Sequence, residues 1–256
     1  KIMLKVKDGS NGLRQSEAVF QHINNLGELS EQIKNSIKNY NIKGICVSKK
    51  PRPTKNSYMP VFMAGYNFAK TSSALLGCEL YETTHQENHI EASLFANNIR
   101  NNDKFLSIHM SGGTTEILLV NKDKDNYNVD IVGGTKDISF GQLIDRIGVK
   151  LGYKNLSGLE NQINKLISNN SKEYIAKILL DSITRNIYKS IIYISKNYGL
   201  NEVVFAGGVS ASKYIKKELK SKLYKENIYA YFAEPEYSTD NALGCAIIGL
   251  SKYLGE

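Results

Sequence analysis

The sequence is poor in several residue types that mark whole classes of protein. It has no tryptophan, four prolines, four histidines and only three cysteines among 256 residues. The cysteines stand far apart in the chain, at Cys46, Cys78 and Cys245, so they indicate neither a disulfide framework nor a thiolate metal cluster. A reducing cytoplasm is therefore the expected environment. No apolar run approaches the roughly 18 residues of a membrane span, so we expect no contact with a membrane.

What the chain does contain is ordinary for a globular protein, with 41% hydrophobic and 23% charged residues. At 256 residues it is long enough for one large domain or for two lobes. The net charge of +8 suits a polyanionic partner such as nucleic acid. Lysine and asparagine are abundant throughout, however, and such a composition raises the charge without any binding site. Basicity therefore permits a nucleic-acid partner without indicating one.

Short apolar strands alternate with amphipathic helices along the chain, which predicts an α/β protein. Strands are predicted over residues 42–48, 105–110, 116–120, 127–132, 202–206 and 228–232. Helices are predicted over residues 61–76, 139–151 and about 172–198, and after each of the last two strands. The three strands from 105 to 132 are expected to form an antiparallel meander. Near the start of the chain, the basic loop "KKPRPTKNSYMP" is typical of a solvated connection.

Two glycine-rich turns follow predicted strands. "SGGTT" (111–115) joins two strands, and "AGGVSAS" (206–212) joins a strand to a helix. Paired glycines let a backbone approach a ligand closely, and free N–H groups at the start of a helix favour phosphate. Each turn alone is weak evidence for a ligand site. The two together are similar to the paired phosphate loops of a two-lobed nucleotide-binding fold.

The stretch "HQENH" places His85 and His89 one helical turn apart, with Cβ atoms about 5–6 Å from each other. That spacing suits a shared cation, and it suits two solvated or hydrogen-bonded side chains equally well. The stretch is not the HExxH of metalloproteases, because Glu87 stands two residues after the first histidine instead of directly after it.

His109 and Asp240 are candidates to complete a metal site. Strand alternation places Ser107 and His109 on one face of their strand, just before the first glycine turn. Asp240 lies in "STDN", directly before the last predicted helix. A carboxylate would complete a mixed nitrogen and oxygen donor set. The alternatives are that Asp240 caps the helix and that His109 lies on a half-exposed strand face.

Five motifs follow one another in a characteristic order. They are HxxxH, SGG-x-T, the helical aspartate of "QLIDRI", AGGVSA and TDNA. In this order they resemble the threonylcarbamoyladenosine synthase family, whose members were formerly labelled O-sialoglycoprotein endopeptidases, over about residues 12 to 254. The resemblance implies an α/β fold of the actin/Hsp70/sugar-kinase type, ribonuclease H-like, with two lobes around a nucleotide cleft.

The implied N-terminal lobe comprises residues 1–104 plus 236–256 and carries the metal-binding helix, and the implied C-terminal lobe comprises residues 105–235 and carries the nucleotide-binding turns. The family begins with a strand and a phosphate turn that have no counterpart in this sequence. The opening residues "KIMLKV" read like a strand entered midway. We therefore expect the first N-terminal strand of the fold to be missing.

The resemblance also implies the ligands and their contacts. A divalent ion, iron or zinc, is expected on His85, His89, His109 and Asp240, beside ATP or an acyl-adenylate. The residues that match the family's nucleotide and substrate contacts are Ser111, Gly112, Gly113, Thr114, Thr115, Asp145, Gly158, Gly207, Gly208 and Ser212. No side chain is an obvious nucleophile, so the implied chemistry depends on positioning and electrostatics.

The activity implied by the resemblance is that of an acyltransferase that moves a threonylcarbamoyl group from its adenylate to the tRNA adenosine beside the anticodon. tRNA and protein partners of a threonylcarbamoyl-transfer complex are then expected, in the cytoplasm. A stripe of lysines on one predicted helix face suits phosphate contact or plain solvation. The stripe consists of Lys213, Lys216, Lys217 and Lys220.

Several alternatives stay open. Thr114 and Ser212 replace residues usual in the family, so a divergent paralogue that binds metal and nucleotide as a scaffold or regulator is a second hypothesis. A metallopeptidase is a weaker third. A shifted register, in which His89 is the first ligand and Ser93 takes the place of the second, is the alternative to the HxxxH alignment.

Overall fold

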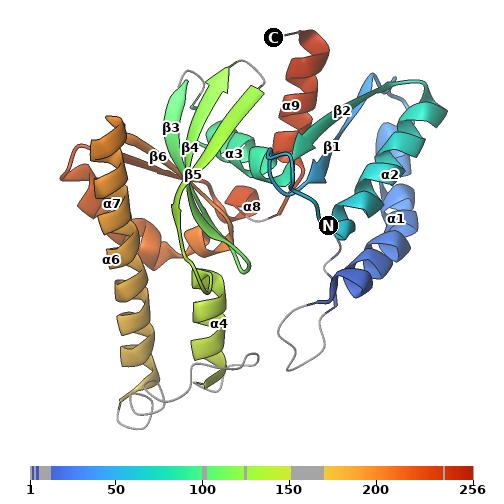
Figure 1. Ribbon diagram of the computed structural model, residues 1–256. Helices are drawn as coiled ribbons and strands as arrows, with labels where there is room; N and C mark the ends of the chain where they lie inside the picture. The colour runs from blue at the N-terminus through green and yellow to red at the C-terminus, as the bar shows by residue number, and fades with distance from the viewer. Residues whose placement is uncertain are drawn as a thin grey trace.

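The computed structural model shows an α/β protein with two β-sheets and helices packed between and around them (Figure 1). It describes residues 2, 4–5, 13–99, 103–123, 126–150, 170–238 and 240–255. The strands are β1 (Gly44–Lys50), β2 (Glu79–Thr84), β3 (Lys104–Met110), β4 (Thr115–Asp123), β5 (Asn126–Gly134), β6 (Glu202–Ala206) and β7 (Tyr229–Phe232). The helices are α1 (Gln15–Ile37), α2 (Pro60–Leu76), α3 (His85–Ala96), α4 (Phe140–Lys150), α6 (Lys172–Tyr198), α7 (Lys213–Tyr224), α8 (Pro235–Ser238) and α9 (Leu243–Leu254), with a 3-10 turn, η1, at Gly208–Ala211.

The larger sheet has five strands in the order β5-β4-β3-β6-β7. β3, β4 and β5 pair antiparallel in succession, which confirms the predicted meander. β6 lies parallel to β3, and β7 lies parallel to β6. Because β6 is parallel to β3 and Ala206 pairs with His109, the glycine turn after β6 lies beside the end of β3, where the first glycine turn begins.

Alternation along β3 decides which side chains meet which helices. Leu106 and Ile108 enter the main core, together with apolar residues of α6 and α7. Phe105 points to the other face and packs with residues of α3 and α9. Ser107 and His109 share that second face, as their spacing predicts, and both are buried. His109 therefore lies on the side of the sheet that α3 covers.

The smaller sheet consists of β1 and β2, which pair in parallel. α2 and α9 both pack on β1, and α1 packs on α2. The sequence patterns did not predict α1 or β2. α1 was missed although Val19, Ile23, Leu26 and Ile33 recur at helical spacing, and β2, "ELYETT", was missed because it is short and half polar.

α3 and α9 lie side by side between the two sheets (Figure 1). Their close approach depends on Gly244, because a Cβ at this position would overlap the backbone of Asn88. On β1, Cys46 and Ser48 hydrogen-bond Cys245 of α9, so two cysteines that are far apart in the sequence meet in the fold.

Within the described residues, no helix combines the length and apolar character needed to cross a membrane. The division into lobes at 104/105 and 235/236 stays a proposal.

Candidate metal and nucleotide site

α3 begins with a reciprocal cap that orients both histidines of the HxxxH motif. The Thr84 hydroxyl accepts a hydrogen bond from the Glu87 N–H at 3.2 Å, and the Glu87 carboxylate accepts one from the Thr84 N–H at 2.7 Å. This capping box sets the first turn of the helix, so His85 and His89 project from the same side. Glu87 also accepts a hydrogen bond from the Thr83 hydroxyl, so its carboxylate serves the helix start instead of facing a metal-bound water.

We expect Thr84→Ala to lower the free energy of unfolding by about 1 kcal/mol, because the first turn of α3 loses its cap. Urea titration would measure this change. Glu87→Gln is the matched control, since glutamine can complete the same capping box. An unchanged unfolding midpoint in Thr84→Ala would show that packing alone holds the helix start.

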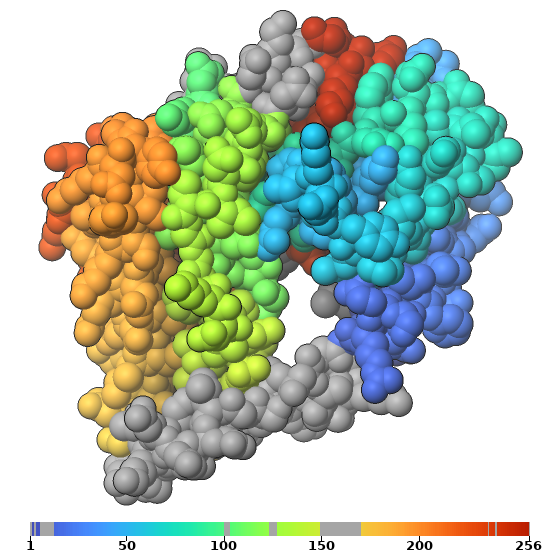
Figure 2. Space-filling view, viewed as in Figure 1, coloured from blue at the N-terminus to red at the C-terminus, as the bar shows by residue number. Residues whose placement is uncertain are grey.

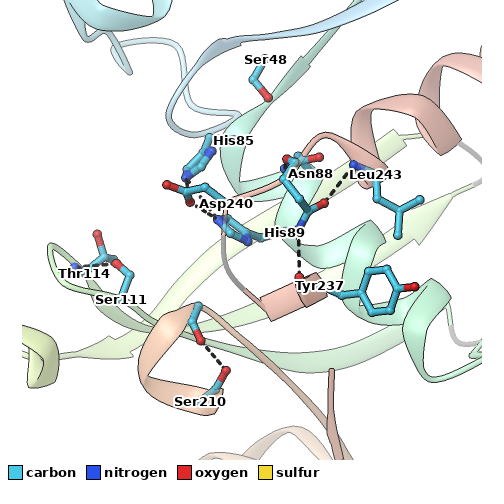
Figure 3. A network of polar contacts seen from close by, with 12 residues as sticks. Ser48, His85, Asn88, His89, Ser111, Thr114, Ser210, Tyr237, Asp240 and Leu243 are labelled. Atoms are coloured by element: carbon cyan, nitrogen blue, oxygen red, sulfur yellow. Dashed lines mark hydrogen bonds and ion pairs between the residues drawn. The ribbon is translucent and has the colours of Figure 1, made fainter. Parts of the chain in front are cut away.

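Asp240 reaches the two histidines from the loop before α9. Asn88 holds that loop against α3: its side-chain amide donates to the Asn241 carbonyl at 2.8 Å, and its carbonyl oxygen accepts from the Cys245 N–H at 2.8 Å. Figure 3 shows Asn88 on α3 beside the start of α9, and His85, His89 and Asp240 pointing toward one another. Asn88 is thus a supporting residue that the sequence patterns did not reveal.

The three donor atoms of this cluster form a small triangle. Nε2 of His85 and Nε2 of His89 are 3.2 Å apart, and Oδ1 of Asp240 lies 3.2 Å from Nε2 of His89 and 3.5 Å from Nε2 of His85. Zinc–nitrogen and zinc–oxygen bonds of about 2.1 Å in a tetrahedral site place ligand atoms about 3.4 Å apart. The spacing and the donor chemistry therefore fit a divalent cation. Ser93, the second ligand in the shifted register, is buried in α3, and that register stays an alternative.

His109 lies next to the cluster without belonging to the three closest donors. Its ring centroid is 4.9 Å from that of His89 and 6.5 Å from that of His85. Its Nε2 is buried and has no hydrogen-bond partner within the described residues. A buried nitrogen without a partner is costly unless a ligand satisfies it, so this atom is available to a cation or a substrate.

Burial keeps two of the histidines neutral at neutral pH. It lowers the pKa of His85 to about 4, and the neighbouring His89 lowers it further. It lowers the pKa of His109 to about 3, again with a contribution from His89. Metal ligands must be deprotonated to bind, and both imidazoles meet that condition.

The first glycine turn is hydrogen-bonded to the start of α4, and its two glycines face open space. The Ser139 hydroxyl donates to the Gly112 carbonyl at 2.7 Å, and the Thr115 hydroxyl accepts from the Phe140 N–H at 2.8 Å, so the start of α4 secures the turn. A Cβ added at Gly112 or Gly113 would meet nothing within 4 Å. Figure 3 shows Ser111 and Thr114 of this turn near the histidine cluster. A ligand can therefore approach this backbone closely.

The second glycine turn packs against the end of β3, directly before the first turn. Gly207 has a φ of 91°, and a Cβ there would overlap the Met110 carbonyl and lie 3.0 Å from the His109 ring. Gly208 is exposed, with nothing within 4 Å of a Cβ. Ser212 caps α7 by accepting a hydrogen bond from the Ile215 N–H at 3.4 Å, which gives this side chain a structural role.

Two further residues, Asp145 and Gly158, were predicted to contact the nucleotide. Asp145 is exposed on α4, and desolvation raises its pKa. Gly158 lies outside the described residues. The nucleotide roles of these residues and of the two turns stay predictions.

The structure corrects the interpretation of the basic loop at 49–60. Arg52 of this loop forms an ion pair with Glu116, at the start of β4, and the Gln86 N–H donates to the Pro51 carbonyl at 3.0 Å. This part of the loop therefore packs on the site and is not merely a solvated connection. Arg52 and Glu116 were missed because neither belongs to a recognisable motif, and they lie 64 positions apart along the chain.

Comparison with known proteins agrees with the five motifs. The family model described as TsaD, tRNA N6-adenosine threonylcarbamoyltransferase, matches residues 9–247. A curated protein of that name from Thermosipho africanus is 28% identical over 232 residues, which cover 75% of this chain and 68% of the relative. One from Nostoc punctiforme is 25% identical and covers 72% and 65%, and one from Malacoplasma penetrans is 30% identical and covers 74% and 70%. The match thus spans about two thirds of each relative.

Solved structures support the predicted fold class. Full-length HypF, in a phosphate- and nucleotide-bound form, superposes with a TM-score of 0.65 at 15% identity, over 90% of this chain and 42% of HypF. A ROK family protein from Streptococcus pneumoniae superposes with a TM-score of 0.56 at 12% identity, over 90% and 86%. These likenesses show the actin/Hsp70/sugar-kinase fold. The match of the family model over residues 9–247 shows that the chain belongs to the TsaD family of tRNA N6-adenosine threonylcarbamoyltransferases.

Proposed function

We propose that this protein binds one divalent metal ion, iron or zinc, next to a nucleotide, and transfers a threonylcarbamoyl group from its adenylate to an adenosine of tRNA. The observation that carries the proposal is the triangle of His85, His89 and Asp240, with sides of 3.2 to 3.5 Å, beside two open glycine turns. His109 is proposed as a fourth group facing the ion. Membership of the family supplies the reaction class.

The chain's own residues would act mainly by positioning. The backbone N–H groups of Gly112 and Gly113 in the first turn and of Gly208 in η1 would hold the phosphate and ribose of the nucleotide, together with Asp145. The ion, when bound, would supply Lewis-acid polarisation of the acyl group. In the transfer, the adenosine amine forms a bond to the carbamoyl carbon, the bond from that carbon to the adenylate oxygen breaks, AMP leaves, and the amine loses a proton to solvent.

Two surface features support tRNA and another protein as partners. Lys213, Lys217 and Lys220 are exposed on α7, and Lys216 is paired with Glu234 at 2.9 Å, so this face offers cations to a tRNA backbone. α1 and α2 expose Phe20, Ile23, Leu75 and Leu76, a composition that suits contact with another protein. We therefore retain both tRNA and a protein partner in the proposal.

A reconstituted transfer assay tests the proposed function. Purified protein, unmodified tRNA, threonylcarbamoyl-adenylate and the partner proteins of the same cell would be combined, and modified adenosine would be detected by mass spectrometry of nuclease digests. We expect modification that disappears after chelation and returns with added iron or zinc. Metal and nucleotide binding without any modification would favour the second candidate, a non-modifying paralogue. The features that motivate this candidate are Thr114 and Ser212, which replace residues usual in the family.

A further inference from the structure

A pocket of about 280 Å³ opens beside the metal triangle and is walled by the loop that follows β1. On one side are Arg52 and Asn56 of that loop. On the other are His85, His109 and Glu116. Small-molecule sites usually start at about 300 Å³, so the pocket has room for the acyl end of a ligand and not for a whole nucleotide.

The loop is folded in a way that keeps Arg52 at the pocket. The Arg52 N–H donates to the Ser57 hydroxyl at 2.9 Å, and the Ser57 N–H donates to the Thr54 carbonyl at 3.2 Å, so the loop closes on itself. The bond from the Gln86 N–H to the Pro51 carbonyl ties it to the first turn of α3. In Figure 2 the segment around residue 50, in bright blue, stands next to the green and yellow-green strands of the larger sheet.

Glu116 fixes the direction of the Arg52 side chain. One guanidinium nitrogen, Nη2, contacts Oε1 of Glu116, whose side chain is only 13% exposed. The Arg52 side chain itself is 41% exposed. A guanidinium has five N–H donors, so a single contact with Glu116 leaves donors available to a second carboxylate in the pocket.

The charge balance of the pocket favours an anion. Arg52 and Glu116 cancel each other, and a divalent ion bound by His85, His89 and Asp240 would leave one net positive charge beside them, because histidines bind a metal in their deprotonated form. Asn56 and Ser57 add neutral hydrogen-bonding groups to the wall. An acyl group that ends in a carboxylate therefore meets both a complementary charge and a planar donor set.

The geometry points to this pocket as the subsite for the free carboxylate of the transferred group, with Arg52 as its anchor and as a determinant of specificity for amino-acid-derived acyl groups. This inference rests on the proposed function, because it needs the adenylate to bind with its acyl end toward the histidines. Glu116 acts only through Arg52 and is a positioning residue.

The test compares ligands that differ only at the carboxylate. Three ligands would be titrated by calorimetry into metal-loaded protein: AMP, a non-hydrolysable threonylcarbamoyl-adenylate analogue, and the same analogue with its carboxylate converted to an amide. We expect the acid to bind at least about 10-fold more tightly than the amide, the size of a charge-assisted hydrogen bond. Arg52→Gln should abolish that preference and leave the Kd for AMP unchanged. Lys55→Gln, which removes a charge from the same loop outside the pocket wall, should keep the preference.

The outcomes separate the two proposals. If none of the three ligands binds the wild-type protein, the proposed function fails. If the analogues bind but acid and amide bind equally, or if Arg52→Gln retains the preference, the carboxylate subsite is wrong while the proposed function stands. The wild-type comparison of acid with amide requires no variant, so poor folding of Arg52→Gln would not leave the question open.

Discussion

Replacement of His89 by alanine is expected to lower the affinity of the protein for iron or zinc by at least about 100-fold. Residues that merely support a ligand are worth about 10–100-fold in metal affinity, and His89 supplies a donor atom itself. It is also the central member of the cluster, with Nε2 3.2 Å from both of the other donors. Metal content after purification, followed by competition with a chelator of known affinity, would measure the loss.

Two further variants make this result interpretable. His89 is only 2% exposed, so alanine at this position also leaves a small cavity, and circular dichroism must show that the fold persists. Asp240 is exposed, with 76% of its side chain accessible, so Asp240→Asn should remove metal with little effect on folding. His22→Ala is the matched control because His22 is exposed on α1. Full metal retention in both His89→Ala and Asp240→Asn would refute the site.

Replacement of Gly207 by alanine is expected to reduce the free energy of unfolding by about 3 kcal/mol or more. A φ of 91° is strained for any residue with a Cβ, and the added carbon would also overlap the Met110 carbonyl. Either the turn after β6 or the end of β3 must move. Since the His109 ring lies 3.0 Å from the same Cβ position, such movement would also disturb the metal cluster.

Gly208→Ala is the comparison that isolates this effect. Its Cβ would meet no atom within 4 Å, so we expect its urea unfolding midpoint to remain close to that of the wild type. We expect Gly208→Ala to lower the affinity of the protein for a nucleotide instead, because the added methyl group would occupy space proposed for the ligand. Equal stability of the two variants would contradict the packing described for the turns.

Local sequence patterns were sufficient for much of the architecture. The meander of β3 to β5 follows from three short apolar stretches and from the glycine-rich and polar turns between them. The long helix α6 was predicted at Lys172–Tyr198 because isoleucines recur along one face and Gly199 ends it in a left-handed conformation. α1 was not predicted, although Val19, Ile23, Leu26 and Ile33 recur at helical spacing. In the fold most of this helix is exposed, and Ala18 is its one buried residue.

The sequence by itself determined the candidate donors, the two glycine turns and the family, because each is written in a short motif whose residues are neighbours in the chain. Only the tertiary structure decided that His85, His89 and Asp240 converge, because that depends on α3 and α9 packing closely at Gly244 and on Asn88 holding the Asp240 loop. The same is true of Arg52 and Glu116, which no motif joins. The loop after β1, which its composition predicted to be a solvated connection, lines the pocket. Its position depends on contacts with β4 and α3, and these contacts leave no local pattern in the sequence.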